Sequence, residues 1–242
     1  MPVRKPRGRK RPSHRRAYLS IVLLILLGGS SITYIYLNGF FPGGSPASST
    51  SATTTVAGCP TPPISASGDV FACVKTPEGS FEVELFTGSA PKTVANFVAL
   101  ARSGFYNNLI WHRITASPAV IQTGDPLTRG GGGNRSDWGT GGSSNTVPLE
   151  VSNSSLHNDR GYLGMARGQD VNSGSSQFYI NTQDNRGLDG SYTVFGRVTS
   201  GIAVVDGISR LPTYTNPNGL YYEQPLDPSR AVLISITILS GG

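Results

Sequence analysis

The chain has 242 residues, of which only 14% are charged, and it is rich in glycine (31 residues) and proline (17 residues). This length allows one or two domains, and the composition favours a loop-rich, mainly β protein over a helical bundle. Residues 1–16 hold 8 of the 20 basic side chains, so the formal net charge of +6 comes from the N-terminus. The remaining chain has 12 basic and 14 acidic side chains. This balance excludes a basic nucleic-acid-binding domain.

The N-terminal region is predicted to anchor the chain in a membrane. Residues 17–37 carry no charge and, as a helix, would span a hydrocarbon layer of about 30 Å. The basic residues 1–16 precede this segment, so the positive-inside rule predicts a cytoplasmic tail, a single transmembrane signal anchor at 17–37 and an extracytoplasmic remainder. A cleaved export signal is the alternative, because Arg15-Arg16 resembles a twin-arginine pattern and Ser45-Pro46-Ala47 loosely resembles a cleavage site.

The segment after the anchor is predicted to be a tether for a folded domain. Residues 38–58 are rich in Ser, Thr, Gly and Pro and poor in apolar side chains, which is typical of a flexible linker. Residues 59–242 then form the predicted domain. Its cysteines, Cys59 and Cys73, lie on the predicted outer side, where disulfides persist. We expect a bridge between them, with two unpaired thiols as the alternative.

The domain is predicted to contain short strands and two helices. Phe81, Val83 and Leu85 alternate with glutamates, which indicates a half-buried strand, and Pro91 opens a helix that ends near Ser103. A second helix is expected at 202–208. Residues 216–224 are expected to be a surface loop, with a part in substrate choice as the alternative. The expected strands are 70–75, 80–86, 110–114, 120–123, 161–166, 177–181, 193–198 and 232–239. This pattern predicts a closed barrel.

Several motifs follow one another in the order and spacing of a known family. They are Trp-His-Arg-Ile at 111–114, Gln-Thr-Gly-Asp at 122–125, Gly-Ser-Ser-Gln-Phe-Tyr-Ile at 174–180 and Leu-Asp-Gly-Ser-Tyr-Thr-Val-Phe-Gly at 188–196. With residues 90–97 and 139–142, they resemble the cyclophilins over about residues 70–239. The resemblance implies a closed eight-stranded antiparallel β-barrel capped by two α-helices, and a peptidyl-prolyl cis-trans isomerase that needs no cofactor.

The implied chemistry is non-covalent. Amide resonance sets a barrier of about 18–20 kcal/mol to rotation about the peptide bond, and a catalyst needs only to weaken that resonance. Arg113 matches the family's catalytic arginine, which would donate toward the prolyl nitrogen. Gln122 matches a glutamine that would hold the substrate backbone and steady the arginine. The other implied substrate-binding residues are Ala119, Val120, Ala166, Arg167, Gln177, Tyr179, Leu188 and Tyr192.

The proline pocket departs from the family pattern at two positions. Ala119 stands where the family has a phenylalanine, and Gly187 stands where a tryptophan or another bulky residue is usual. Losing a phenylalanine face would cost about 1–3 kcal/mol of burial for a bound proline. The segment 114–120 is also one residue longer than the pattern, so a bulge could bring a different side chain into the pocket.

The sequence therefore predicts a membrane-anchored, monomeric foldase that accelerates X-Pro isomerisation in exported proteins. Its substrates would be proline-containing polypeptides. The alternative is a module or chaperone that binds proline-containing segments with weak or no isomerase activity, which Ala119 and Gly187 favour. No metal is expected, because His112 and His157 lack carboxylate or cysteine partners at metal-ligand spacing.

Overall fold

The computed structural model describes residues 58–59, 70–216, 218 and 222–239. All of them belong to one compact unit, Ala52–Gly242. The basic tail, the expected transmembrane segment 17–37 and nearly all of the expected linker lie outside the described residues. Among the helices that are described, none is long and apolar enough to cross a membrane.

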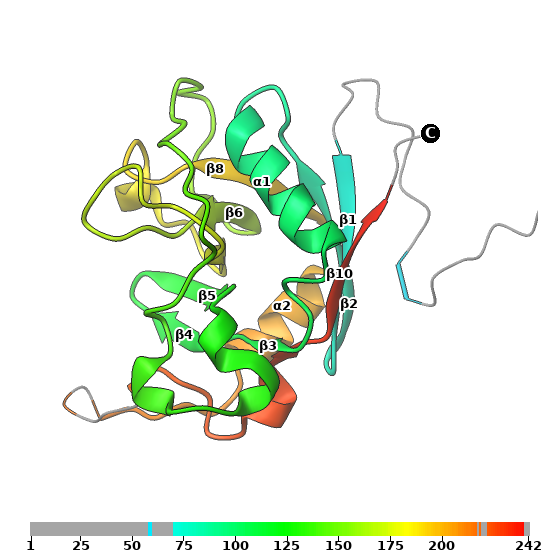
Figure 1. The fold of residues 1–242 in the computed structure, drawn as a ribbon, viewed down its shortest axis with the longest axis vertical. Coiled ribbons are helices and arrows are strands. Elements are labelled where there is room, and N and C mark those ends of the chain that lie inside the picture. Colours follow the sequence, from blue (N-terminus) through cyan, green and yellow to red (C-terminus); the bar gives the residue numbers. More distant parts are fainter. Residues whose placement is uncertain (1–57, 60–69, 217, 219–221, 240–242) are drawn as a thin grey trace, which may run out of the picture. The chain divides into compact units, whose positions relative to one another are not determined.

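An eight-stranded antiparallel sheet forms the body of the domain (Figure 1). Its strands lie in the order β10-β1-β2-β8-β6-β7-β5-β4, so β10 and β4 are its edges. A separate ladder pairs β3 (Leu109–Ile110) with β9 (Val232–Leu233). The strands of the large sheet are β1 (Val70–Thr76), β2 (Gly79–Leu85), β4 (Arg113–Ala116), β5 (Ala119–Thr123), β6 (Tyr162–Met165), β7 (Phe178–Asn181), β8 (Val194–Ser200) and β10 (Ser235–Leu239). The mainly β fold is therefore confirmed.

The predicted closed barrel is wrong, because the sheet is a curled half-barrel in which no ladder of described residues joins β4 to β10. The segments 109–116 and 232–239 each break into two short strands, at residues 111–112 and at Ile234. After these breaks, β4 and β10 hydrogen-bond to different parts of the chain. Ile234 N, just before β10, donates to Lys75 O of β1 at 2.8 Å, whereas Ile114 N of β4 donates to Glu223 O at 2.9 Å. A loop thus bonds to the edge of β4 that the last strand would occupy in a closed barrel.

Two α-helices pack on the sheet. The first, α1 (Pro91–Arg102), lies against β10, and α2 (Ile202–Ser209) lies against β2, β4 and β5 (Figure 1). No side chain of the preceding turn caps α1. Instead the Glu150 carboxylate accepts hydrogen bonds from Lys92 N at 3.1 Å and Thr93 N at 2.9 Å. A carboxylate at this helix end is stabilising because it satisfies free N–H groups and faces the positive end of the dipole.

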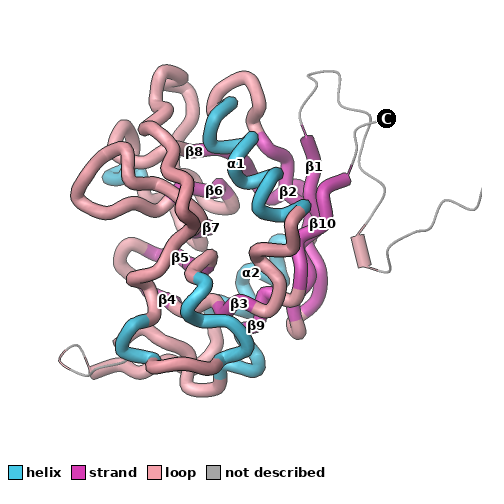
Figure 2. The backbone as a smooth tube through the Cα atoms, viewed as in Figure 1, coloured by secondary structure: helices cyan, strands magenta, loops and turns pink. Residues whose placement is uncertain are grey.

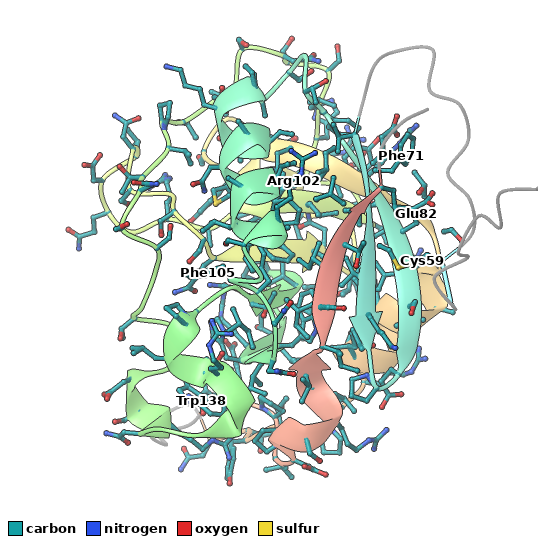
Figure 3. All side chains as sticks on the ribbon, turned by 45° about the vertical axis from the view of Figure 1, so that its right-hand side comes forward. Cys59, Phe71, Glu82, Arg102, Phe105 and Trp138 are labelled. Carbon is teal, nitrogen blue, oxygen red and sulfur yellow. A yellow bond between two sulfur atoms is a disulfide. The ribbon has the colours of Figure 1, made fainter. Side chains whose placement is uncertain are left out.

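Long connections and short helical turns make up much of the rest, as Figure 2 shows between β5 and β6. The turns are the 3-10 helices η1 (Pro126–Gly131), η2 (Arg135–Asp137), η3 (Arg186–Leu188) and η4 (Pro228–Ala231). The structure also joins Cys59 to Cys73 of β1 in a disulfide, with the two Cα atoms 5.9 Å apart. Figure 3 marks Cys59 beside the sheet.

The core lies inside the curl of the sheet and is largely aromatic. The Phe178 ring centroid lies 5.3 Å from that of Phe97, 5.6 Å from Tyr106 and 5.8 Å from Trp111, each time nearly edge-to-face. Such geometry is favourable for aromatic pairs. Beside this cluster a row of buried aliphatic side chains crosses four strands, namely Ile114, Ile121, Ile180 and Leu163.

Candidate functional site

A row of residues crosses the same four strands on the face of the sheet opposite the core. Arg113 on β4 pairs with Gln122 on β5, Gln122 with Tyr179 on β7, and Tyr179 with Gly164 on β6. Each is a direct chain neighbour of a residue in the aliphatic row, and successive strand residues point to opposite faces. Burial of the aliphatic row therefore fixes this cross-strand row on the other side of the sheet.

The cross-strand row forms the floor of a cavity of about 350 Å³. The cavity combines apolar and aromatic side chains with a small number of polar groups, which is typical of a ligand site. It is lined by His112, Arg113, Pro118, Val120, Gln122, Trp138, Gly139, Ala166, Arg167, Tyr179, Leu188, Tyr192, Tyr222, Glu223 and Gln224.

Tyr179 fills the space that Gly164 leaves open. A Cβ atom on Gly164 would lie 2.1 Å from Tyr179 Cζ, so a side chain at this position is incompatible with the ring. The Tyr179 hydroxyl donates to Asn158 Oδ1 at 2.7 Å, and the ring meets that of Tyr192 edge-on at 5.9 Å. Burial raises the pKa of Tyr179 far above its usual range, so it stays a neutral apolar wall with a fixed orientation.

The Arg113 guanidinium is held from one side only. Its Nε donates to Glu223 Oε2 at 2.8 Å, and Thr115 Oγ1 donates to Glu223 Oε1 at 2.6 Å. No described residue hydrogen-bonds to the two terminal nitrogens of Arg113. With 38% of the side chain exposed, these nitrogens are available to a ligand in the cavity.

Gln122 does not steady Arg113 as the resemblance implied. Its Nε2 donates to Gln177 Oε1 at 2.8 Å. Gln177 Nε2 in turn donates to Gly139 O at 2.9 Å and to Gly141 O at 2.7 Å. Gln122 is therefore fixed by the neighbouring strand and loop. No described residue donates a hydrogen bond to its side-chain oxygen.

His112 lies beneath the cavity and is buried, with no hydrogen bond from either ring nitrogen to a described residue. Burial lowers the pKa of His112 to about 4, although the nearby Asp125 carboxylate works in the opposite direction. The imidazole is therefore neutral at neutral pH. It adds no second positive charge beside Arg113.

Most of the residues predicted to bind substrate lie together in this cavity. Those that line it are Val120, Ala166, Arg167, Tyr179, Leu188 and Tyr192, in addition to Arg113 and Gln122. Gln177 lines an adjoining cavity of about 300 Å³ that shares Gln122, Ala166 and Arg167 with the first. Gly187 lies at the rim beside Leu188, and a Cβ atom there would meet nothing within 4 Å. A larger side chain at this position would therefore meet no obstacle close to the backbone.

Ala119 does not reach the cavity, contrary to the sequence-based expectation. It lies two residues before Ile121 on β5 and therefore faces the same side as that core residue. Asn185 fixes its backbone, accepting from Ala119 N at 3.0 Å and donating to Ala119 O at 2.9 Å. Pro118 lines the cavity instead. The longer lead-in to Gln122 thus changes which side chain enters.

Sequence reasoning named no site residue in one wall of the cavity, here called the loop wall, which consists of Trp138, Tyr222, Glu223 and Gln224. Residues 216–224 were expected to be a surface loop, yet three of these residues come from its end. Figure 3 shows Trp138 in the loop region that carries η2. The concentration of tyrosine beside a glutamate at 221–223 was the only local signal.

Comparisons with known proteins agree on one family. The family model described as cyclophilin type peptidyl-prolyl cis-trans isomerase/CLD matches residues 71–229. A peptidyl-prolyl cis-trans isomerase-like 1 of Aspergillus niger is 41% identical over 138 residues, covering 57% of this chain and 80% of the relative. A peptidyl-prolyl cis-trans isomerase of Helicobacter pylori is 40% identical over 143 residues, covering 58% of this chain and 80% of the relative.

Solved structures give the same result. The crystal structure of a Cryptosporidium parvum cyclophilin type peptidyl-prolyl cis-trans isomerase superposes with a TM-score of 0.60 at 28% identity, covering 72% of this chain and 99% of that one. The same protein in the presence of the dipeptide Ala-Pro superposes with a TM-score of 0.58.

Proposed function

Because the chain belongs to the cyclophilin-type peptidyl-prolyl cis-trans isomerase family, we propose that it is a membrane-anchored foldase that accelerates X-Pro isomerisation in exported proteins. Its substrates are proline-containing segments of polypeptides that fold outside the cytoplasm. It acts as a monomer and without a cofactor.

Arg113 carries this proposal, because it lines the cavity and its terminal N–H groups have no hydrogen-bond partner among the described residues. A donor aimed at the prolyl nitrogen localises the nitrogen lone pair and so lowers the double-bond character of the C–N bond. The twisted amide gains most from this contact, since its lone pair is no longer delocalised. The contact therefore stabilises the transition state more than the bound ground state.

The remaining cavity residues orient the substrate. Pro118, Val120, Tyr179 and Leu188 offer apolar surface for the pyrrolidine ring. The Ala166 main chain lies where the first cavity meets the adjoining one, and it would hold the peptide backbone as it passes between them. Arg167 is stacked over the Tyr192 ring at 4.9 Å from its centroid, which keeps its side chain at the rim.

The location is supported by the N-terminal sequence and by the cysteines. The eight basic residues before the uncharged segment 17–37 favour a cytoplasmic N-terminus and an external domain. The Cys59–Cys73 disulfide fits an oxidising compartment. Isomerisation needs no ATP, so the chemistry can proceed there.

The first test measures isomerisation of a slowly relaxing X-Pro peptide by the purified full-length chain in detergent micelles. We expect Arg113→Ala to lower kcat/KM by about 100- to 1000-fold, in the range seen when one preorganised donor is removed. Arg197→Ala is the matched control, because Arg197 on β8 also donates through Nε to a glutamate, Glu84 Oε2 at 2.7 Å, but does not line the cavity. Equal rates for wild type and Arg113→Ala would refute the enzyme proposal.

Two further outcomes separate the finer parts of the proposal. Peptide binding without turnover would favour the alternative of a binding module, which the open rim at Gly187 makes reasonable. Protease added to right-side-out membrane vesicles should cleave the chain after residue 37 and leave the tail, residues 1–16, protected. If the protease leaves the whole chain uncut in these vesicles, the external location is refuted.

A further inference from the structure

Glu223 is fixed at both ends of its carboxylate beside the Arg113 side chain. Oε2 accepts from Arg113 Nε at 2.8 Å and Oε1 accepts from Thr115 Oγ1 at 2.6 Å. Arg113 and Thr115 are two residues apart on β4, so both project from the same face of the strand. Only 15% of the Glu223 side chain is exposed. The carboxylate therefore bridges two successive outward positions of β4.

The backbone of Glu223 is also held at two points. Glu223 O accepts from Ile114 N at 2.9 Å, and Glu223 N donates to Tyr214 O at 2.9 Å. The residue has a φ of 64°, in the left-handed region that non-glycine residues rarely adopt. Strained conformations of this kind persist where the surroundings fix them and often mark functional sites. The loop is thus bound to the open edge of β4 at the residue that contacts Arg113.

Fixing Nε determines the direction of the other donors of Arg113. The guanidinium is planar and rigid, so one directed bond at Nε limits its rotation and sets where the terminal N–H groups point. Gln122, the side chain implied to steady the arginine, bonds to Gln177 instead. Among the described residues, Glu223 is the hydrogen-bond partner of the Arg113 side chain.

We propose that Glu223 is the positioning residue for Arg113, and that residues 222–224 are therefore part of the active site. The inference rests on the proposed isomerase function and adds to it the means by which the catalytic donor is aimed. The Tyr214–Tyr222 and Thr213–Pro225 bridges lie on either side of Glu223 in the chain and hold it in place. Without Glu223, the Arg113 side chain would sample several rotamers and present its donors correctly only part of the time.

The test compares Glu223→Ala with Glu223→Gln in the full-length chain. We expect Glu223→Ala to lower kcat about ten- to a hundredfold, because small misplacements of a catalytic group cost up to about 100-fold, and to change KM by less than about threefold. Glu223→Gln keeps an oxygen that can accept from Nε and should recover most of kcat. A loss confined to KM, or equal kcat in Glu223→Ala and wild type, would overturn the proposal.

A second measurement reports on positioning without turnover. The Arg113 Nε–H resonance in a ¹⁵N-correlated NMR spectrum should be protected from solvent exchange in wild type and lose that protection in Glu223→Ala. Protection that survives Glu223→Ala would overturn the proposal, whether or not the wild type isomerises peptides. Failure of the proposed function would instead show as a wild-type rate equal to that of Arg113→Ala.

Matched variants separate positioning from general stability. Glu84→Ala removes the corresponding partner of Arg197 on the sheet away from the cavity, and it should leave kcat unchanged. Thr115→Val removes the second bond to Glu223 without touching Arg113, and it should lower kcat less than Glu223→Ala. If Glu223→Ala does not fold, Thr115→Val and Glu223→Gln still decide the question. The proposal would be overturned by two results together. Thr115→Val would keep the wild-type kcat and Nε–H protection, and Glu223→Gln would be as impaired as Arg113→Ala.

Discussion

The cross-strand row and the loop wall both line the cavity but are fixed in different ways. Register with buried neighbours fixes the strand positions of Arg113, Gln122 and Tyr179 and the face from which they project. No strand of the described residues includes the loop wall. It depends on isolated bridges, such as Tyr214–Tyr222, and on single contacts such as Ile114 N to Glu223 O. Changes beneath the row should therefore affect both stability and catalysis, whereas changes in the wall should affect catalysis or binding alone.

The largest effect on stability is expected from titration of His112, which is buried next to Arg113 in the chain. Its pKa is lowered to about 4 in the folded protein by burial, against the usual 6.5. Above pH 6.5 the residue is neutral in both states and has no effect. As pH falls from 6.5 to 4, the unfolded chain binds the proton first, so folding should lose up to about 3 kcal/mol.

This loss is measured by urea unfolding of wild type and His112→Gln at pH 7, 6, 5 and 4. The glutamine variant removes the titration, so its stability should fall less steeply between pH 6.5 and 4. Parallel pH profiles for the two proteins would show that His112 has the same pKa in the folded and the unfolded chain, and burial would then not lower its pKa.

A pair of glycines gives the next largest effect and compares the two sides of the cavity directly. Gly164→Ala places a Cβ 2.1 Å from Tyr179 Cζ, whereas Gly187→Ala meets nothing within 4 Å. We expect Gly164→Ala to destabilise the fold by about 1–3 kcal/mol, as overpacking does, and to lower kcat/KM by displacing the Tyr179 ring. Gly187→Ala should change neither by a measurable amount. Thermal unfolding and the peptide assay, run on both variants, check this contrast.

The smallest effect is expected at Tyr222, which belongs to the loop wall and is 45% exposed. Tyr222→Ala removes part of an aromatic contact with bound peptide and should weaken binding about two- to fivefold, since a partly buried ring contributes on the order of 1 kcal/mol or less. Leu226→Ala is the control, because Leu226 is similarly exposed nearby but does not line the cavity. Isothermal titration with a proline peptide measures both. A loss of stability in Tyr222→Ala would show that the wall supports the fold.

The sequence predicted those parts of the structure that local patterns determine. Alternation around Phe81 placed β2, and the apolar spacing after Pro91 placed α1, with ends within one or two residues. Family motifs placed Arg113 and Gln122 on adjacent strands. These features follow from side-chain periodicity or from short motifs, and neither depends on distant residues.

The rest depends on contacts between residues far apart in the chain. The break at 111–112 follows from Trp111 N donating to Ala231 O, and the capping of α1 follows from Glu150, 57 residues beyond Thr93. The local sequence pattern indicates neither contact. Glu223 reaches Arg113 over 110 residues and from a loop without periodicity, so its role could not be inferred from the sequence.

The disulfide has a consequence for how the domain stays attached to the chain before it. Residues 60–72 lie within the covalent loop closed by Cys59 and Cys73, whose sulfurs are joined across a separation of 14 residues. A single proteolytic cut in that loop would leave the domain tethered through the bridge. Tension applied upstream would likewise enter the fold at Cys73, in the middle of β1 and between its partners Glu82 on β2 and Thr237 on β10. Such a pull must shear two ladders at once instead of peeling a strand from its end.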